Sequence, residues 1–152
     1  MRIISLKKAT IADIPALLEL EKSVAGTKIY SPTLTKNEWK EELQKSEVYL
    51  IENNSIVAGS LLYEKKDNEN FYIGGLVVNP RFQGQGIARE AMMIVLGKFK
   101  NVKRIYLVTH PDNTKAIALY KSLGFVAESR RENYYSDGEP RLVMARILKC
   151  NR

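Results

Sequence analysis

The sequence predicts a mixed α/β protein of the α+β kind, with a mixed sheet flanked by helices. Strand-like runs outnumber helical segments, and two pairs of neighbouring runs are separated by short turn-like stretches. In addition, an apolar run at 72–78 leads through a glycine-rich turn into a helical pattern. Helices interspersed among strands, together with hairpins, are typical of a sheet covered by helices. The length of 152 residues suits one domain spanning 1–152.

The first third of the chain is predicted to form one strand and two helices. Residues 2–7 are strand-like, and Thr10 followed by Asp13 is typical of a helix start. The helix that follows carries leucines at helical spacing and is expected to end at Gly26. An aperiodic stretch at 27–35 then predicts a loop before the second helix.

The remaining elements alternate between strands and helices. Short turn-like stretches divide the first and last strand pairs, which predicts two hairpins. The elements expected in chain order are strands at 48–52, 56–64 and 72–78, a helix at 86–96, a strand at 103–109, a helix at 113–123, and strands at 125–135 and 141–148.

The turn between the strand at 72–78 and the helix after it has the form of a phosphate-binding loop. The first amides of a helix lack intrahelical partners and the helix dipole attracts anions, so the run from Gln83 to Arg89 presents a row of donors. Glycine lets a phosphate approach the backbone. Neither the ending of a P-loop nor a complete dinucleotide fingerprint is present, so spacing alone fits a tight turn without a ligand equally well.

Composition narrows the classes of function. The net charge is +7, but basic residues are scattered among acids, so a main role in nucleic-acid binding is not expected. No apolar run approaches the ~20 residues of a membrane span. One histidine, His110, and one cysteine, Cys150, do not make up the usual zinc ligand sets, and no metal is expected. A lone cysteine fits a reducing compartment, and the expected location is cytoplasmic.

Two motifs resemble those of the GNAT family of N-acetyltransferases. The pattern Gln83-x-x-Gly86-x-Ala88 resembles the loop with which the family cradles the pyrophosphate of acetyl-CoA. The stretch NTKAIALYKSLGF at 113–125 resembles the family's second motif, and a strand-like RIYLVT separates the two. The resemblance covers almost the whole chain, and the C-terminal half is similar to bacterial ribosomal-protein-alanine N-acetyltransferases. It implies the GNAT fold, a mixed, mostly antiparallel sheet of about six to seven strands flanked by about four helices.

The resemblance also implies which residues hold acetyl-CoA. In the family, two central strands separate at a bulge, for which Gly74-Gly75 is the expected place, and the acyl arm lies in the opening. Tyr120 occupies the position of the general acid, whose phenol protonates the leaving thiolate. The expected contacts with acetyl-CoA are Leu76, Val77 and Val78 on the strand, Gln83, Gly84, Gln85, Gly86, Ile87, Ala88 and Arg89 in the loop, and Asn113 and Tyr120.

The general base is left open by the sequence. The ribosomal-protein acetyltransferases usually have a glutamate where this chain has Val108, and a valine cannot take a proton. His110 lies two residues further on and is one candidate. Glu21 is another candidate catalytic residue and, with Tyr30, is expected to contact the acceptor amine. A chain of ordered waters is a further alternative.

The acceptor is also left open. Tyr134 and Tyr135 match a tyrosine pair that lines the substrate entrance in peptide-acetylating relatives, which favours a protein N terminus. Those relatives carry Gly-Glu-Asp-Ala where this chain has Gly-Glu-Pro-Arg at 138–141, so a small amine such as a polyamine or an antibiotic is the other candidate. Two rival functions are a catalytically silent coenzyme A sensor, motivated by Val108, and a basic nucleic-acid module. A homodimer is compatible with these patterns, which do not determine the oligomeric state.

Overall fold

The computed structural model describes residues 2–99 and 101–148, so the expectation for Cys150 lies outside the described residues. Seven strands and four α-helices lie within these ranges, and two short 3-10 turns precede α1 and α3. The strands are β1 (Ile4–Lys8), β2 (Glu47–Asn53), β3 (Ile56–Lys65), β4 (Asn70–Val78), β5 (Arg104–Thr109), β6 (Val126–Arg131) and β7 (Arg141–Ile147). The helices are α1 (Ile14–Val24), α2 (Lys36–Lys45), α3 (Ile87–Leu96) and α4 (Thr114–Ser122).

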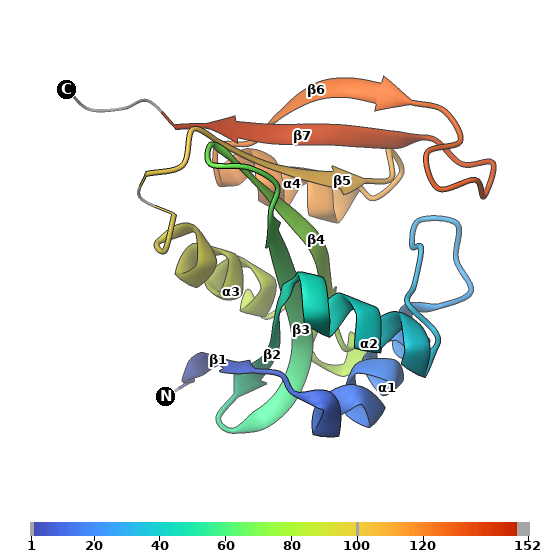
Figure 1. Ribbon diagram of the computed structural model, residues 1–152, viewed down its shortest axis with the longest axis vertical. Coiled ribbons are helices and arrows are strands. Elements are labelled where there is room, and N and C mark those ends of the chain that lie inside the picture. Colours follow the sequence, from blue (N-terminus) through green and yellow to red (C-terminus); the bar gives the residue numbers. More distant parts are fainter. Residues whose placement is uncertain (1, 100, 149–152) are drawn as a thin grey trace.

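All seven strands form one sheet in the order β1-β2-β3-β4-β5-β7-β6. Every neighbouring pair is antiparallel except β4 and β5, which are parallel. Figure 1 shows the sheet running from β1 near the N terminus to the β6–β7 hairpin at the opposite end. The predicted mixed, mostly antiparallel sheet is confirmed.

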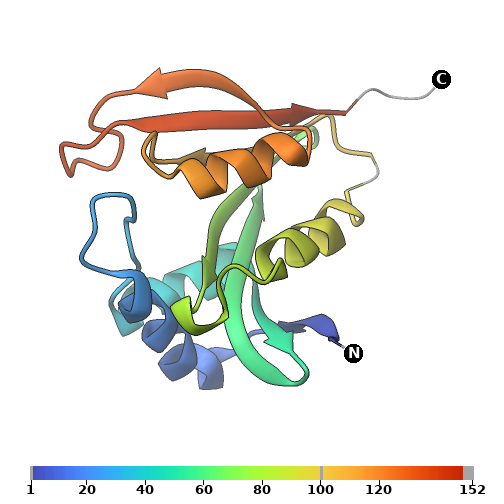
Figure 2. The same cartoon turned by 180° about the vertical axis from the view of Figure 1, so that it is seen from behind.

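Helices cover both faces of the sheet. On one face, apolar side chains of α1 and α2, among them Leu17 and Trp39, pack against Leu50 and Leu62 of the sheet. On the other face, α3 and α4 bury Met92 and other apolar side chains against β3, β4, β5 and β7. Figure 2 shows both of these helices in front of the sheet. The two cores follow from the helical spacing of apolar residues in each helix.

A β-bulge at Gly74 changes which face of the sheet the residues of β4 point to. The register of β3 and β4 shifts because Leu62 is paired with Gly75 whereas Tyr63 is paired with Ile73, so Gly74 is an extra residue. A Cβ atom at Gly74 would lie 2.4 Å from Leu62 Cδ1. The extra residue reverses the alternation of faces along β4. Ile73 therefore packs with α3, whereas Val77 packs with α1 and α2.

Beyond this bulge, β4 leaves its neighbour. It pairs with β5 only from Asn70 to Ile73, and the two strands diverge from there on (Figure 1). The predicted bulge at Gly74-Gly75 and the opening between the two central strands are both confirmed. The C-terminal half of β4 consequently has a free edge on this side.

Most strand ends lie within about two residues of the prediction, and one strand ends well before its predicted limit. The strand expected at 125–135 ends at Arg131, because Asn133 and Ser136 adopt left-handed backbone angles, with φ values of 51° and 62°. Residues in that conformation interrupt a strand. Tyr134 and Tyr135 consequently lie in the loop between β6 and β7.

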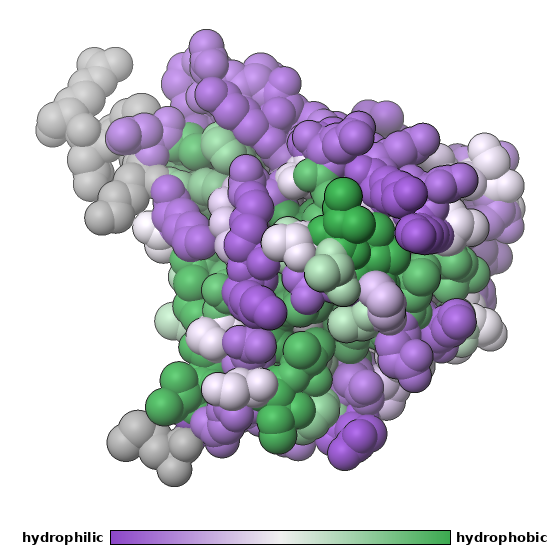
Figure 3. Space-filling model, turned by 60° about the horizontal axis from the view of Figure 1, so that its bottom comes forward, coloured by the Kyte–Doolittle hydropathy of each residue, from purple (hydrophilic) through white to green (hydrophobic). Residues whose placement is uncertain are grey.

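Exposed apolar side chains are scattered over the described part of the surface. Exposed apolar side chains come from several segments, among them Ile3, Ile11, Ile56, Met93 and Ile147. On the face in Figure 3, apolar side chains are interspersed with polar ones that gather toward the periphery. Within the described ranges, no helix combines the length and hydrophobicity needed to cross a membrane.

Candidate active site

A cleft of about 750 Å³ opens beside the free edge of β4. It is bounded by β4, the glycine loop (residues 83–89), the start of α4 and the loop between α1 and α2. Most of the residues expected to contact acetyl-CoA line it, namely Leu76, Val78, Gln83, Gly84, Gly86, Ile87, Ala88, Arg89, Asn113 and Tyr120. The structure therefore brings together residues from segments that lie far apart in the sequence.

Two expected residues do not line the cleft. Val77 is buried on the opposite face of β4, because alternate residues of a strand point to opposite faces. Gln85 is exposed, and its backbone carbonyl accepts a hydrogen bond from Arg2. Thr114 and Lys115, in the first turn of α4, do line the cleft and were not predicted. Their position directly after Asn113 is the signal that could have identified them.

The glycine loop is held in a shape that exposes the start of α3. Gly84 and Gly86 both have φ of 79°, a left-handed conformation that side chains disfavour, and Gly86 caps the helix. The side chain of Gln83 donates a hydrogen bond to the carbonyl oxygen of Val78, at 2.9 Å. Arg89 reaches Ser122 of α4, with 2.5 Å between Nη1 and Oγ. The loop is thus tied to β4 and α4, while the first amides of α3 face an open cleft.

Tyr120 lies where α4 meets the wall of the cleft. Its side chain is buried, and burial, with a smaller contribution from Tyr30, raises the pKa of the phenol above its ordinary value. Asn113 caps α4, accepting a hydrogen bond from Ala116 N at 3.3 Å. The phenol of Tyr120 therefore carries its proton at neutral pH and can act as a donor toward a group in the cleft, but not as a base.

A smaller cavity of about 140 Å³ adjoins the cleft. Both spaces are lined by Ile29, Tyr30, Leu76, Asn113 and Tyr120, so these residues mark their junction. The smaller cavity also contains four residues expected near the acceptor or the base, namely Glu21, Tyr30, His110 and Tyr135. Tyr134 is not among its lining residues and lies against Tyr135, with the ring centroids 4.8 Å apart.

The carboxyl group of Glu21 is buried in the wall of the smaller cavity, and the residue is only 8% exposed. Burial raises the pKa of this carboxyl from 4.5 to about 7, and the charge of Glu38 adds to the rise. A hydrogen bond from the backbone of Thr33 opposes it. A carboxyl with a pKa near neutrality exchanges its proton readily at physiological pH, which is the property of a general acid or base.

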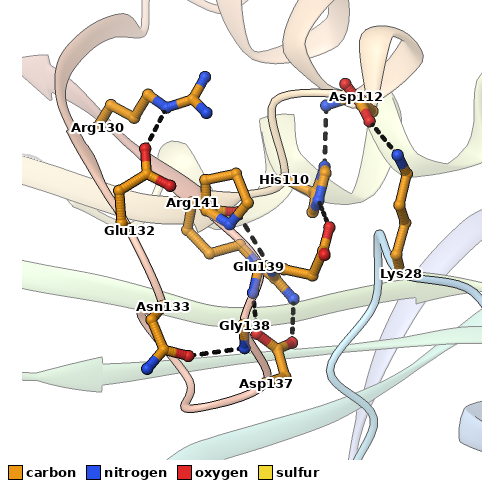
Figure 4. A network of polar contacts seen from close by, with 11 residues as sticks. Lys28, His110, Asp112, Arg130, Glu132, Asn133, Asp137, Gly138, Glu139 and Arg141 are labelled. Carbon is orange, nitrogen blue, oxygen red and sulfur yellow. Dashed lines mark hydrogen bonds and ion pairs between the residues drawn. The ribbon is translucent and has the colours of Figure 1, made fainter.

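His110 is engaged at both ring nitrogens. Nδ1 accepts a hydrogen bond from the backbone amide of Asp112 at 3.0 Å, and Nε2 lies 2.8 Å from Oε1 of Glu139 (Figure 4). Because Nδ1 is an acceptor, these bonds assign the proton to Nε2. The imidazole therefore holds Glu139 in place, and neither nitrogen is left to take a proton from an acceptor.

The contacts of His110 belong to a network of polar contacts (Figure 4). This network joins the loop between β5 and α4 to the loop between α1 and α2 and to the loop between β6 and β7. Lys28, from the loop between α1 and α2, forms an ion pair with Asp112 at 2.7 Å. Arg141, which is 2% exposed, forms an ion pair with Asp137 at 3.0 Å within the β6–β7 segment. Sequence reasoning missed these pairs, because each joins side chains whose types are common on protein surfaces. Two members of the network, His110 and Arg141, line the smaller cavity.

Metal ligation finds no support in the part of the chain that the structure describes. Residues 2–99 and 101–148 contain no group of three or more His, Cys, Asp or Glu side chains placed to hold an ion. The charged side chains that line the two spaces are of both signs, with Arg89, Lys115 and Asp112 in the cleft and Glu21, Glu42 and Arg141 in the smaller cavity.

The comparison with protein families decides the class of the site. Residues 14–125 match the model of the acetyltransferase (GNAT) family. The chain belongs to the GNAT family. It is a GNAT-type N-acetyltransferase, and enzymes of this family use acetyl-CoA.

Individual relatives agree with this assignment. The ribosomal protein bS18-alanine N-acetyltransferase of Escherichia coli K12 is 28% identical over 138 residues, which cover 88% of this chain and 90% of that protein. The crystal structure of the ribosomal-protein-S18-alanine N-acetyltransferase from Escherichia coli matches with a TM-score of 0.83 at 23% identity, covering 100% of this chain and 97% of the other. A GNAT acetyltransferase from Elizabethkingia anophelis, with acetyl-CoA bound, matches with a TM-score of 0.75 at 22% identity, covering 97% of this chain and 98% of the other. At these identities the structural matches show the shared fold.

Proposed function

We propose that this GNAT enzyme transfers the acetyl group of acetyl-CoA directly to a primary amine, with a protein N terminus as the acceptor. The observation that carries the proposal is the junction between the cleft and the smaller cavity. The larger cleft has room for an extended cosubstrate, and the adjoining cavity, which shares Tyr120 with it, suits the amine that reacts with that cosubstrate. Two substrates would thus meet between Leu76 and Tyr120.

In this proposal the cleft residues hold acetyl-CoA. The amides at the start of α3 would bind the pyrophosphate, because they lack intrahelical partners and lie at the positive end of the helix dipole. Leu76 and Val78 lie along the free edge of β4, where backbone groups would meet the amides of the pantetheine arm. The volume of about 750 Å³ and a lining that combines apolar side chains with the glycine loop fit such a molecule.

The chemistry requires a base for the amine and an acid for the thiol. Acetyl-CoA supplies a thioester whose carbonyl carbon accepts the amine nitrogen. We assign Glu21 to take the proton from the amine, since its pKa of about 7 allows it to be ionised before the amine arrives. Tyr120 would keep its proton for the departing sulfur. The new bond is N–C and the broken bond is C–S. The nitrogen gives one proton to Glu21 and the sulfur receives one from Tyr120, and exchange with solvent then removes the proton from Glu21 and returns one to Tyr120.

The proposed base is Glu21, one of the candidates that the sequence left open, rather than His110 beside Val108. Val108 lines the smaller cavity but has no titratable group. His110 lines it too, yet both ring nitrogens are already hydrogen bonded. Glu21 approaches the cavity from α1, on the other side, and has the carboxyl group that Val108 lacks. We therefore propose a carboxylate base supplied by a different element.

A protein N terminus is favoured as acceptor by the relatives and by the rim of the site. The Escherichia coli relative acts, by its name, on an alanine of a ribosomal protein. Tyr134 and Tyr135 stand on the β6–β7 loop beside the smaller cavity, at a place where an extended chain could leave it. One observation favours a polyamine as the second candidate: Glu21 and Glu42 both line the smaller cavity, and two carboxyl groups suit a polycation.

Free-thiol release from acetyl-CoA, measured with a panel of acceptors, tests the proposal. The panel contains a peptide with a free alanine N terminus, the same peptide acetylated at that terminus, spermidine and an aminoglycoside. We expect turnover with the free peptide, and mass spectrometry should locate the acetyl group on its α-amine. Turnover with spermidine alone would assign the polyamine instead. Coenzyme binding without turnover on any acceptor would favour a silent coenzyme A sensor.

A further inference from the structure

Arg2 reaches the back of the glycine loop from the segment that precedes β1. Its guanidinium donates a hydrogen bond to the carbonyl oxygen of Gln85 and forms an ion pair with the carboxylate of Glu90 in the first turn of α3. A Cβ atom added at Gly86 would lie 3.5 Å from Arg2 Nη2. In the sequence, more than eighty residues separate Arg2 from the loop that it contacts. Neither motif of the family contains it.

The hydrogen bond to Gln85 determines where an amide of the loop points. In a trans peptide unit the C=O and N–H groups point in opposite directions, and no peptide bond of the described chain is cis. Because the Gln85 carbonyl points toward Arg2, the N–H of Gly86 in the same peptide unit points away from it. Gly86 lines the cleft whereas Gln85 does not. Arg2 therefore holds the Gly86 amide toward the cleft.

The ion pair with Glu90 changes the charge beside the loop. A carboxylate in the first turn of a helix stabilises that helix, but it also repels an anion bound at the same end. Glu90 is four residues from Gly86, and its amide donates to the Gly86 carbonyl at 3.1 Å. The guanidinium of Arg2 compensates this negative charge. Helix stability and anion binding are thereby made compatible at one helix end.

We propose that Arg2 is a positioning residue for the pyrophosphate of acetyl-CoA. It acts through the Gln85–Gly86 peptide, whose amide it directs into the cleft, and through Glu90, whose charge it neutralises. This inference rests on the proposed function, because it assumes that the glycine loop binds the pyrophosphate. The two claims nevertheless fail in different ways in the experiment below.

The test is the affinity for coenzyme A, measured by calorimetry on the full chain without an acceptor. Arg2→Gln is expected to weaken binding about tenfold, which corresponds to about 1.4 kcal/mol. Arg131→Gln, on the exposed strand β6, removes the same charge far from the loop and should leave the affinity within about twofold. At saturating acetyl-CoA, kcat of Arg2→Gln should equal that of the wild type while KM rises.

Variants of Glu90 test whether removing its negative charge strengthens or weakens coenzyme A binding. If Arg2 compensates Glu90, then Glu90→Gln should tighten coenzyme A binding about twofold to threefold, and Arg2→Gln/Glu90→Gln should bind more tightly than Arg2→Gln alone. The thermal midpoint of each variant without ligand reports any loss of folding. A purely structural Arg2 would lower the midpoint without this recovery of affinity.

The outcomes separate the two claims. A wild-type protein that does not bind coenzyme A would overturn the proposed function. Wild-type binding together with equal affinities for Arg2→Gln and Arg131→Gln would overturn the role of Arg2 alone. Weaker binding by Glu90→Gln would overturn it as well, and this result does not depend on whether Arg2→Gln folds.

Discussion

At the scale of single residues, burial changes the acid–base properties of Glu21. Its carboxyl group is buried, and the resulting pKa of about 7 would suit the proposed role as a base near neutral pH. The same carboxyl next to water would be ionised but would be a weaker base toward the amine. The location of Glu21 on α1, rather than its sequence neighbours, produces this property.

The first prediction concerns the pH dependence of the rate. In the wild type, kcat should rise with pH through about pH 7, because Glu21 acts only when it is ionised. Glu21→Gln should lower kcat by at least about a hundredfold and remove this limb of the profile. Steady-state kinetics from about pH 5.5 to pH 8.5 measures both effects.

A control variant tests the cause of the raised pKa. Glu38→Gln leaves the Glu21 side chain in place but removes a charge that raises its pKa. In Glu38→Gln, the rise of kcat with pH should therefore occur at lower pH, while the maximal kcat is retained. An unchanged pH profile in Glu21→Gln would show that another group titrates.

Stability reports the same pKa independently of activity. Between pH 4.5 and about 7 the folded protein binds a proton at Glu21 that the unfolded chain has released, so stability falls as pH rises through this window. Glu21→Gln removes that dependence and should have the higher thermal midpoint at about pH 8. A lower midpoint for the variant at that pH would indicate a carboxylate that the fold stabilises in its charged form.

At the scale of elements, Gly59 allows the close approach of β3 to β4, whose other edge is the one along which the pantetheine arm is proposed to lie. Gly59 of β3 is paired with Val78, next to the register shift between β2 and β3. A Cβ atom at Gly59 would lie 2.3 Å from the backbone oxygen of Val77, which cannot rotate away. The close approach of β3 and β4 at this point therefore depends on the absence of a side chain.

The second prediction follows from this contact. Gly59→Ala should lower the free energy of unfolding by about 2 kcal/mol or more, because β3 and β4 must separate. Gly97→Ala is the matched control, since Gly97 has φ of −65° and an added Cβ would meet its nearest neighbour at 3.4 Å. The control should change stability by less than about 1 kcal/mol. Equal unfolding midpoints in urea for the two variants would contradict this account of the strand contact.

The third prediction concerns the loop between β6 and β7. Glu139 accepts from the buried imidazole of His110, so Glu139→Ala would leave Nε2–H without this partner and should cost about 1–3 kcal/mol. Glu132→Ala removes a partner of Arg130 in an exposed pair and should cost less than about 1 kcal/mol. Chemical unfolding measures both. Equal losses would mean that the His110–Glu139 contact does not hold the loop.

At the scale of the whole molecule, the sequence predicted the sheet and the glycine loop because both depend on local signals. Apolar alternation, helix caps and glycines identify each element from a few neighbouring residues. The bulge at Gly74-Gly75 was also predictable, since paired glycines inside a strand are unusual. The strand at 125–135 was placed too long, because the left-handed angles of Asn133 and Ser136 leave no clear pattern in the sequence.

The arrangement of the site was less predictable than the fold. Leu76, Gln83 and Tyr120 were identified through motifs, and they do line one cleft. The burial of Glu21, the His110–Glu139 contact and the reach of Arg2 each require segments distant in the sequence to meet. The periodicity of apolar residues describes one helix or strand at a time and does not indicate which distant segments come into contact.

The measurement that tests the central claim most directly is thiol release from acetyl-CoA by the wild type and Tyr120→Phe, with a free-amine peptide as acceptor. Phenylalanine keeps the ring that packs beside Phe125 and removes only the proton-donating hydroxyl. The account predicts a loss in kcat of at least about tenfold, with coenzyme A affinity within about twofold of the wild type. Equal kcat values in the two proteins would contradict the assignment of Tyr120 as the acid.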